Sequence, residues 1–230
     1  KTNLFSKSPV FLTSPPLPNE ETYSIHSALE EELYKQLKIK GNLIILTGNP
    51  GIGKTYIARK MFYKLQNYYN RLAWIEYNGD LKSSITFAFN NNQKHNTQNC
   101  FSSAIKQLIA EPKNTILFID NVSENAEKDD FLSRISGLGI TGCITTRLKW
   151  LDMYKSIEVP VATTNDCLNL FKSYNNTCFE KQQDKLINIL TLFGNNALLT
   201  ILLAKNGQEG LEKARKVLPD LIVSEVDLSG

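Results

Sequence analysis

The segment LIILTGNPGIGKTYIA, residues 43–58, places a glycine-studded turn, a lysine and a hydroxyl residue between an apolar run and an amphipathic run. The pattern Gly-x-x-x-x-Gly-Lys-[Ser/Thr] is met by Gly48, Gly53, Lys54 and Thr55. In such a phosphate loop, backbone N–H groups curl around phosphate oxygens and the following helix offers its positive end. Lys54 would reach the β- and γ-phosphates, and Thr55 would ligate Mg²⁺. The predicted contacts to the nucleotide phosphates are Gly48, Asn49, Pro50, Gly51, Ile52, Gly53, Lys54, Thr55 and Tyr56.

A second carboxylate for the metal is expected at the end of the apolar run TILFIDNV. Asp120 ends this run, which would lie beside the first strand, and we predict that it organises Mg²⁺ together with Thr55. Its neighbour is Asn121, where many ATPases carry an acid that orients or deprotonates the attacking water, and an amide cannot accept a proton in that way. Glu124 could substitute, although an exposed, solvated charge is the simpler interpretation.

A third group follows the run GCITTRLKW, whose end would deliver Thr145, Thr146 and Arg147 to the same edge of the sheet as the phosphate loop. Ligands of doubly wound sheets bind at that carboxyl edge. Arg147 could therefore contact the γ-phosphate and sense its presence through a bidentate guanidinium. The alternative is an ordinary surface arginine.

Short apolar runs alternate with helical patterns over much of the chain. The expected strands are residues 42–47, 72–77, 115–120, 142–146 and 156–161, and a helix with a leucine stripe is expected at 26–38. Such alternation indicates β-α-β units. We predict an α/β fold of the P-loop NTPase type, with a doubly wound, parallel, five-stranded sheet.

The pattern changes after Pro160, where helical periods follow one another without a strand between them. Proline is frequent in residues 8–21, which predicts an extended lead-in. The expected organisation is a lead-in at 1–22, a nucleotide-binding domain at 23–162 and a small all-helical domain at 163–225.

Composition narrows the class of protein. The chain has 230 residues, 42% of them hydrophobic, and a net charge of +3 with Lys and Arg scattered among acids, which gives no direct indication of a nucleic-acid or membrane partner. The four cysteines lack zinc or redox spacing, so we expect reduced thiols. No membrane span or secretory pattern is found, and we expect a cytoplasmic protein. The missing initiator methionine suggests a piece of something longer.

The order of these motifs resembles a known family. GNPGIGKT, RLAWIEYNGDLKSS, TILFIDNV, GCITTRLKWL, IEVPVATTNDCLNLF and LFGNNALLTILLAK are similar to the nucleotide-binding domains of STAND ATPases of the NB-ARC type, over roughly residues 20 to 215. That type includes plant disease-resistance proteins, apoptosome nucleators and bacterial signalling and defence proteins.

The resemblance implies roles for matching positions. Lys54, Asp120 and Arg147 would form the catalytic set, with Arg147 as the γ-phosphate sensor. Asn196 stands where the family has a proline that packs near adenine, and we expect it to contact the nucleotide. The base would lie between residues 23–25 and residues 194–197. An acid is usual at the position of Asn121, so slow hydrolysis is expected.

The implied function is a Mg²⁺-dependent ATP/ADP switch of a larger signalling or defence protein. Such a protein would self-associate through its NTPase domain after an unidentified sensor ligand binds. ATP or ADP is favoured over a guanine nucleotide because no Asn/Thr-Lys-x-Asp segment occurs. The alternative is an AAA+ motor or loader acting on protein or nucleic acid. A small-molecule kinase is weaker, since no acceptor pocket or base is identifiable.

Overall fold

The computed structural model describes residues 8–17, 25–90, 100–148 and 154–206. The chain divides into two compact units that are interleaved in sequence. We call the first, residues 1–18, 29–47 and 54–158, the sheet unit, and the second, residues 19–28, 48–53 and 159–230, the helical unit. The domain limits expected from the sequence are continuous ranges, and they stay a prediction.

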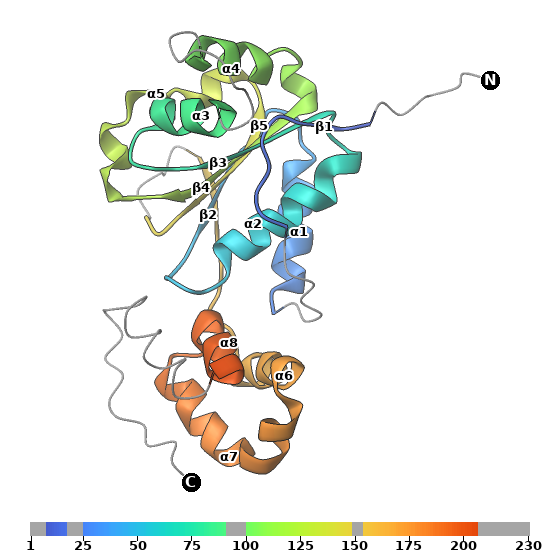
Figure 1. Ribbon diagram of the computed structural model, residues 1–230, viewed down its shortest axis with the longest axis vertical. Helices are drawn as coiled ribbons and strands as arrows, with labels where there is room; N and C mark the ends of the chain where they lie inside the picture. Colours follow the sequence, from blue (N-terminus) through green and yellow to red (C-terminus); the bar gives the residue numbers. More distant parts are fainter. Residues whose placement is uncertain (1–7, 18–24, 91–99, 149–153, 207–230) are drawn as a thin grey trace, which may run out of the picture. The chain divides into compact units, whose positions relative to one another are not determined.

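The sheet unit is built on a six-stranded sheet in the order β1-β3-β4-β5-β2-β6, and all its strand pairs are parallel. The strands are β1 Val10–Phe11, β2 Leu43–Thr47, β3 Arg71–Glu76, β4 Thr115–Val122, β5 Thr141–Thr146 and β6 Lys155–Glu158. All five expected strands occur, which confirms the α/β class of fold (Figure 1).

The predicted count of five strands is wrong, because the lead-in supplies a sixth. Val10 and Phe11 pair in parallel with Arg71 and Leu72 at the edge of the sheet. Just beyond, the Thr13 hydroxyl donates to the Trp74 carbonyl at 2.6 Å. An extended segment offers backbone groups that an open strand edge can pair with. The alternation of apolar residues in so short a strand is too weak a signal to read.

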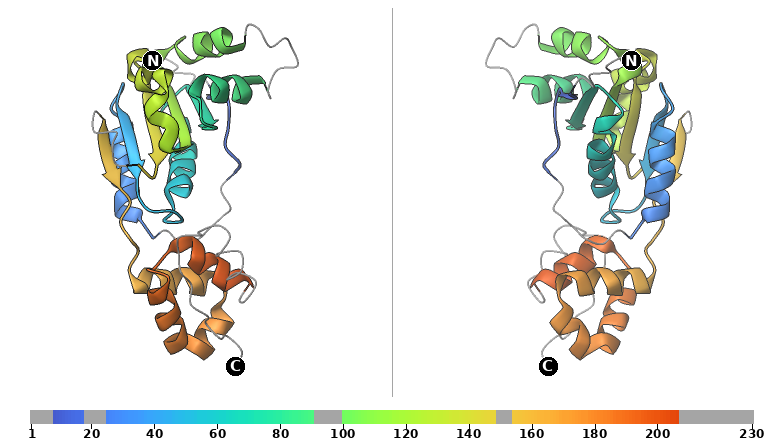
Figure 2. Two further views of the ribbon diagram at one scale, coloured as in Figure 1. Left: turned by 90° about the vertical axis from the view of Figure 1, so that its left-hand side faces the viewer. Right: turned by 90° about the vertical axis from the view of Figure 1, so that its right-hand side faces the viewer.

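Helices cover both faces of the sheet (Figures 1 and 2). One face carries α1 Ser27–Leu37 and α2 Lys54–Lys64, and the other carries α3 Leu81–Asn90, α4 Cys100–Leu108 and α5 Asp130–Ser133. Short 3-10 turns link these elements at Leu65–Asn67, Pro112–Asn114, Glu124–Lys128 and Ile135–Leu138. On the α2 face the Phe62 ring lies 6.0 Å from the Trp74 ring and 5.6 Å from the Phe118 ring. Burial on both sides explains why these strands are nearly continuous apolar runs.

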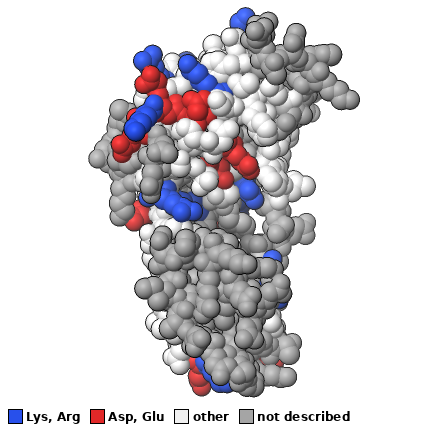
Figure 3. Space-filling model, turned by 60° about the vertical axis from the view of Figure 1, so that its left-hand side comes forward, with Lys and Arg blue, Asp and Glu red and all other residues white. Residues whose placement is uncertain are grey.

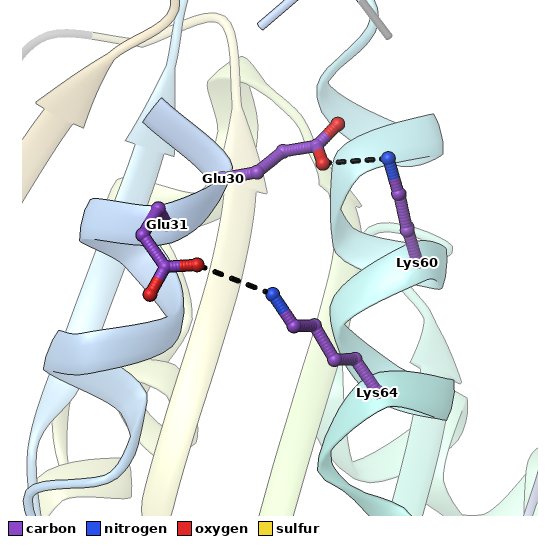
Figure 4. Close-up of polar contacts among 4 residues, drawn as sticks. All are labelled: Glu30, Glu31, Lys60 and Lys64. Atoms are coloured by element: carbon purple, nitrogen blue, oxygen red, sulfur yellow. Dashed lines mark hydrogen bonds and ion pairs between the residues drawn. The ribbon is translucent and has the colours of Figure 1, made fainter. Parts of the chain in front are cut away.

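Two ion pairs join α1 to α2 (Figure 4). Lys60 Nζ lies 2.6 Å from Glu30 Oε2, and Lys64 Nζ lies 3.4 Å from Glu31 Oε2. The Glu30 side chain is only 8% exposed, whereas the outer pair is open to solvent and contributes little to stability. The inner pair therefore matters more for holding α1 against the helix that begins at Lys54.

The helical unit contains α6 Thr164–Tyr174, α7 Asn176–Leu192 and α8 Ala197–Asn206. A capping box starts α6, because Thr163 and Asp166 satisfy each other's backbone N–H groups. The three helices share a buried core that includes Cys167, Phe171 and Leu190. Ile25, which lies before α1, packs against this core.

Charges of both signs are interspersed on the face shown in Figure 3. This arrangement fits the mixed surface expected from the composition. Among the described residues, no helix is both long and apolar enough to cross a membrane.

Asp129 ties three elements of the sheet unit together. Its Oδ2 accepts from the Leu81 amide at 2.7 Å and the Tyr77 hydroxyl at 3.0 Å, and its Oδ1 accepts from the Phe131 and Leu132 amides at 3.0 and 2.9 Å. The start of α3, the start of α5 and the end of β3 thus meet on one buried carboxylate. Burial, followed by the hydrogen bond to Asp129, raises the pKa of Tyr77.

Asp129→Ala should lower the free energy of unfolding by about 3 kcal/mol or more, because it leaves several buried donors without an acceptor. Asp130→Ala is the matched control, since its side chain is exposed and a first-turn acid is worth less than about 1 kcal/mol. Urea titration of both variants measures the difference. Equal losses would show that the Asp129 network contributes nothing specific.

Candidate functional site

The phosphate loop lies between β2 and α2, and its backbone depends on glycine. Gly51 has φ +72° and Gly53 has φ +109°, values that residues with a side chain rarely adopt. Gly51 is not demanded by the sequence pattern, yet a Cβ there would lie 2.6 Å from Asn196 Oδ1. The position therefore has a structural requirement that the motif does not record.

Lys54, Asp120 and Arg147 lie in one electrostatic environment at the carboxyl end of the strands. Burial and, to a smaller extent, the positive charge of Arg147 lower the pKa of Lys54, Asp120 opposes the shift, and the resulting pKa is about 8. Arg147 follows β5 and is exposed, whereas Asp120 is 5% exposed. The three residues expected to act together are thus brought together. A bound phosphate would favour the charged form of the lysine.

Thr55 and Asp120 form the expected pair. The Thr55 hydroxyl donates to Asp120 Oδ1 at 2.9 Å. A hydroxyl oxygen and a carboxylate side by side are the hard oxygen ligands that Mg²⁺ prefers, so the residues present fit this metal. No group of three or more His, Cys, Asp or Glu side chains that could hold a metal occurs in the part of the chain that the structure describes.

Thr145 completes this cluster. Its hydroxyl donates to the same Asp120 Oδ1 at 2.5 Å and accepts from the Asn121 amide at 2.8 Å. The register of β4 and β5 shifts between Ile119 and Val122, and Asn121 there has φ +62°. Asparagine tolerates this left-handed conformation better than most residues. Thr145 therefore fixes both the carboxylate and the bulge that follows it.

Asn196 lies against the phosphate loop within the helical unit. Its Nδ2 donates to the Pro50 carbonyl at 2.8 Å, and its Oδ1 accepts from the Leu199 amide at 3.2 Å. The buried His26 Nε2 lies 3.2 Å from the Ile52 carbonyl. The sequence gives no signal for His26, which begins a predicted helix and belongs to no motif.

The remaining predicted residues are placed as follows. Tyr56 lies in the first turn of α2, with Lys60 Nζ 6.0 Å from its ring centre, and Asn49 is exposed. Glu124 begins a 3-10 turn, and its side chain lies outside what the structure describes. Residues 23 and 24, expected near the base, also lie outside the described residues.

Thr145→Val should destabilise the sheet unit by about 2–4 kcal/mol, because a hydrogen bond to a carboxylate and one to a backbone amide are both lost. Thr145→Ser keeps the hydroxyl and should retain most of the stability. Amide hydrogen exchange of Asn121 gives a local readout, since this N–H should exchange faster only in the valine variant. Unchanged exchange at Asn121 would contradict the role given to Thr145.

Comparison with known proteins finds a matching family and a partial relative. Residues 24–148 match the family described as nephrocystin 3, N-terminal. Over 60 residues the chain is 42% identical to the type IV methyl-directed restriction enzyme EcoKMcrB subunit of Escherichia coli (strain K12), a match that covers 22% of this chain and only 13% of that protein.

One solved structure extends the comparison to the fold. The Walker-type ATPase paby2304 of Pyrococcus abyssi has a TM-score of 0.55 and 13% identity, over 92% of this chain and 77% of that chain. AMPPCP-bound DnaA from Aquifex aeolicus has a TM-score of 0.49 and 17% identity, over 88% of this chain and 70% of that chain. The chain has the fold of a P-loop nucleotide-binding ATPase domain, and, because the family match spans more than half of its 230 residues, it belongs to the nephrocystin 3, N-terminal family.

Proposed function

We propose that this chain is an adenine-nucleotide-binding switch module of a larger signalling or defence protein. The observation that carries the proposal is the convergence of Lys54, Thr55, Asp120 and Arg147 at the carboxyl edge of the sheet. That edge is where doubly wound sheets bind their ligands.

Each residue has a distinct task in this proposal. Lys54 binds the β- and γ-phosphates, and Thr55 with Asp120 holds Mg²⁺, which when bound neutralises phosphate charge. Arg147 is exposed at the end of β5 and is suited to sense the γ-phosphate. The nucleotide is ATP or ADP, and Asn196 is proposed as one of its contacts.

The switch interpretation is supported by Asn121. This residue directly follows Asp120, its backbone is left-handed, and its side chain is exposed. An amide at this position cannot take a proton from water, so the nucleotide acts as a ligand more than as a substrate. We propose weak ATPase activity for this reason.

The wider setting follows from the resemblance. In the full-length protein the NTPase domain would mediate self-association after a sensor ligand binds, in the cytoplasm. Neither a membrane nor a nucleic-acid partner is part of the proposal.

The second candidate is an AAA+ motor or loader. It is favoured by the segment that is 42% identical to a restriction-enzyme subunit. A motor must turn over ATP repeatedly, whereas a switch needs only to distinguish bound nucleotides. The rate of hydrolysis therefore separates the two.

Lys54→Ala should weaken MgADP and MgATP binding by about 10- to 100-fold, the loss expected when a charge-assisted phosphate contact of roughly 1.5–3 kcal/mol is removed. Lys64→Ala is the matched control, because this lysine lies on the same helix and pairs with Glu31. Calorimetry with MgATP, MgADP and MgGTP measures affinity and base preference together. Equal affinities of wild type and Lys54→Ala would remove the assignment of the loop.

Hydrolysis should be slow, well below the 1–10³ s⁻¹ typical of dedicated enzymes. An absent general base is worth about 10²–10⁴-fold and an absent arginine finger about 10³–10⁵-fold. These factors do not simply multiply, but together they lead us to expect turnover nearer one per hour than one per second. Asn121→Asp should raise the rate with little change in ATP affinity. Phosphate release under single-turnover conditions measures this. A wild-type rate of several per second that Glu124→Ala abolishes would favour the motor.

A further inference from the structure

Three consecutive carbonyl groups of the phosphate loop accept hydrogen bonds from His26 and from residues at the start of α8. Pro50 O accepts from Asn196 Nδ2 at 2.8 Å, Gly51 O accepts from the Leu198 amide at 3.0 Å, and Ile52 O lies 3.2 Å from His26 Nε2. A carbonyl oxygen can only accept, so the His26 contact requires the proton on Nε2. All of these residues belong to the helical unit.

The direction of a carbonyl determines the direction of the next amide. In a planar trans peptide the C=O of one residue and the N–H of the following residue point in opposite directions, and no cis peptide occurs in the described chain. Bonds to the carbonyls of residues 50, 51 and 52 therefore turn the N–H groups of Gly51, Ile52 and Gly53 away from His26 and the start of α8. These are amides that a phosphate loop uses to bind its anion.

The donors are themselves held in place. Asn196 caps α8 by accepting from the Leu199 amide at 3.2 Å, and the preceding Asn195 carbonyl accepts from the buried Cys167 thiol at 3.3 Å. His26 is 9% exposed. Gly51 leaves the space that Asn196 fills, since a Cβ there would lie 2.6 Å from its Oδ1. The contact between Asn196 and the phosphate loop is thus held in place both by α8 and by the loop.

We propose that Asn196 and His26 are positioning residues that orient the phosphate-loop amides, and that Asn196 acts on the phosphates through the loop and not only through the base. This role rests on the proposed nucleotide binding, so the experiment must separate failure of one from failure of the other.

The variants remove one donor at a time. Asn196→Ser keeps a good cap for α8 but loses the amide that reaches Pro50. His26→Leu removes the donor to Ile52, and His26→Gln restores an N–H. Asn175→Ser is the matched control, because the Asn175 Nδ2 also donates to a backbone carbonyl of the helical unit, that of Ala204 at 3.1 Å.

Calorimetry with MgADP and with magnesium pyrophosphate, which has no base, gives the readout. Asn196→Ser and His26→Leu should each weaken both ligands by about tenfold, the fold-change that 1.4 kcal/mol produces. His26→Gln and Asn175→Ser should bind like the wild type. Melting temperatures without nucleotide show whether each variant is folded, and His26→Leu and Asn196→Ser test the proposal independently if one of them is not.

The outcomes are distinct. Wild type that binds neither MgADP nor magnesium pyrophosphate would refute the proposed function itself. Wild-type binding combined with unchanged affinities in Asn196→Ser and His26→Leu would overturn the positioning role alone. A loss for MgADP without a loss for magnesium pyrophosphate in Asn196→Ser would assign Asn196 to the base, and a loss in His26→Gln as large as in His26→Leu would show that the N–H is not what matters.

Discussion

A single carboxylate oxygen joins two elements at the carboxyl edge of the sheet. Asp120 Oδ1 accepts hydroxyl hydrogens from Thr55, on the helix after the phosphate loop, and from Thr145, on the neighbouring strand. Hydrogen bonds to a buried charged group are among the stronger ones in proteins. These two donors stabilise a buried carboxylate near the end of β4. The parallel register that aligns β4 with β5, and the apolar cover of α2, are what bring them there.

Much of this arrangement could be predicted from the sequence. Buried parallel strands are short apolar runs, so all five expected strands lie close to their predicted limits. The phosphate loop is a local motif, and its lysine and threonine need no long-range information to be found. Asp120 and Arg147 follow from a rule of sheet geometry, since Asp120 lies near the end of β4, Arg147 directly follows β5, and the carboxyl ends of these strands share an edge.

What could not be predicted depends on contacts between residues far apart in the chain. His26 precedes Ile52 by 26 positions, and Asn196 lies 146 positions from Pro50. No motif spacing identifies either residue. Each bonds to a backbone carbonyl, which every residue type has, so the partner's side chain gives no clue. The two-residue strand β1 could not be predicted for a similar reason, since its pairing depends on the open edge of β3. The two hydrogen bonds of the Thr145 hydroxyl depend on a bulge in β4 that no residue pattern predicts.

Two asparagines shape the backbone around the candidate site. Asn121 adopts a left-handed backbone at the bulge between β4 and β5, and its amide side chain cannot act as a base. Asn196 caps α8 as well as any residue could, and it adds a donor to the phosphate loop. In the proposed switch, Asn121 would leave the attacking water without a base, and Asn196 would hold the phosphate loop by its Pro50 carbonyl. Under that proposal both asparagines would favour a long-lived bound nucleotide over rapid turnover, and a bound nucleotide that persists is what a switch requires of its ligand.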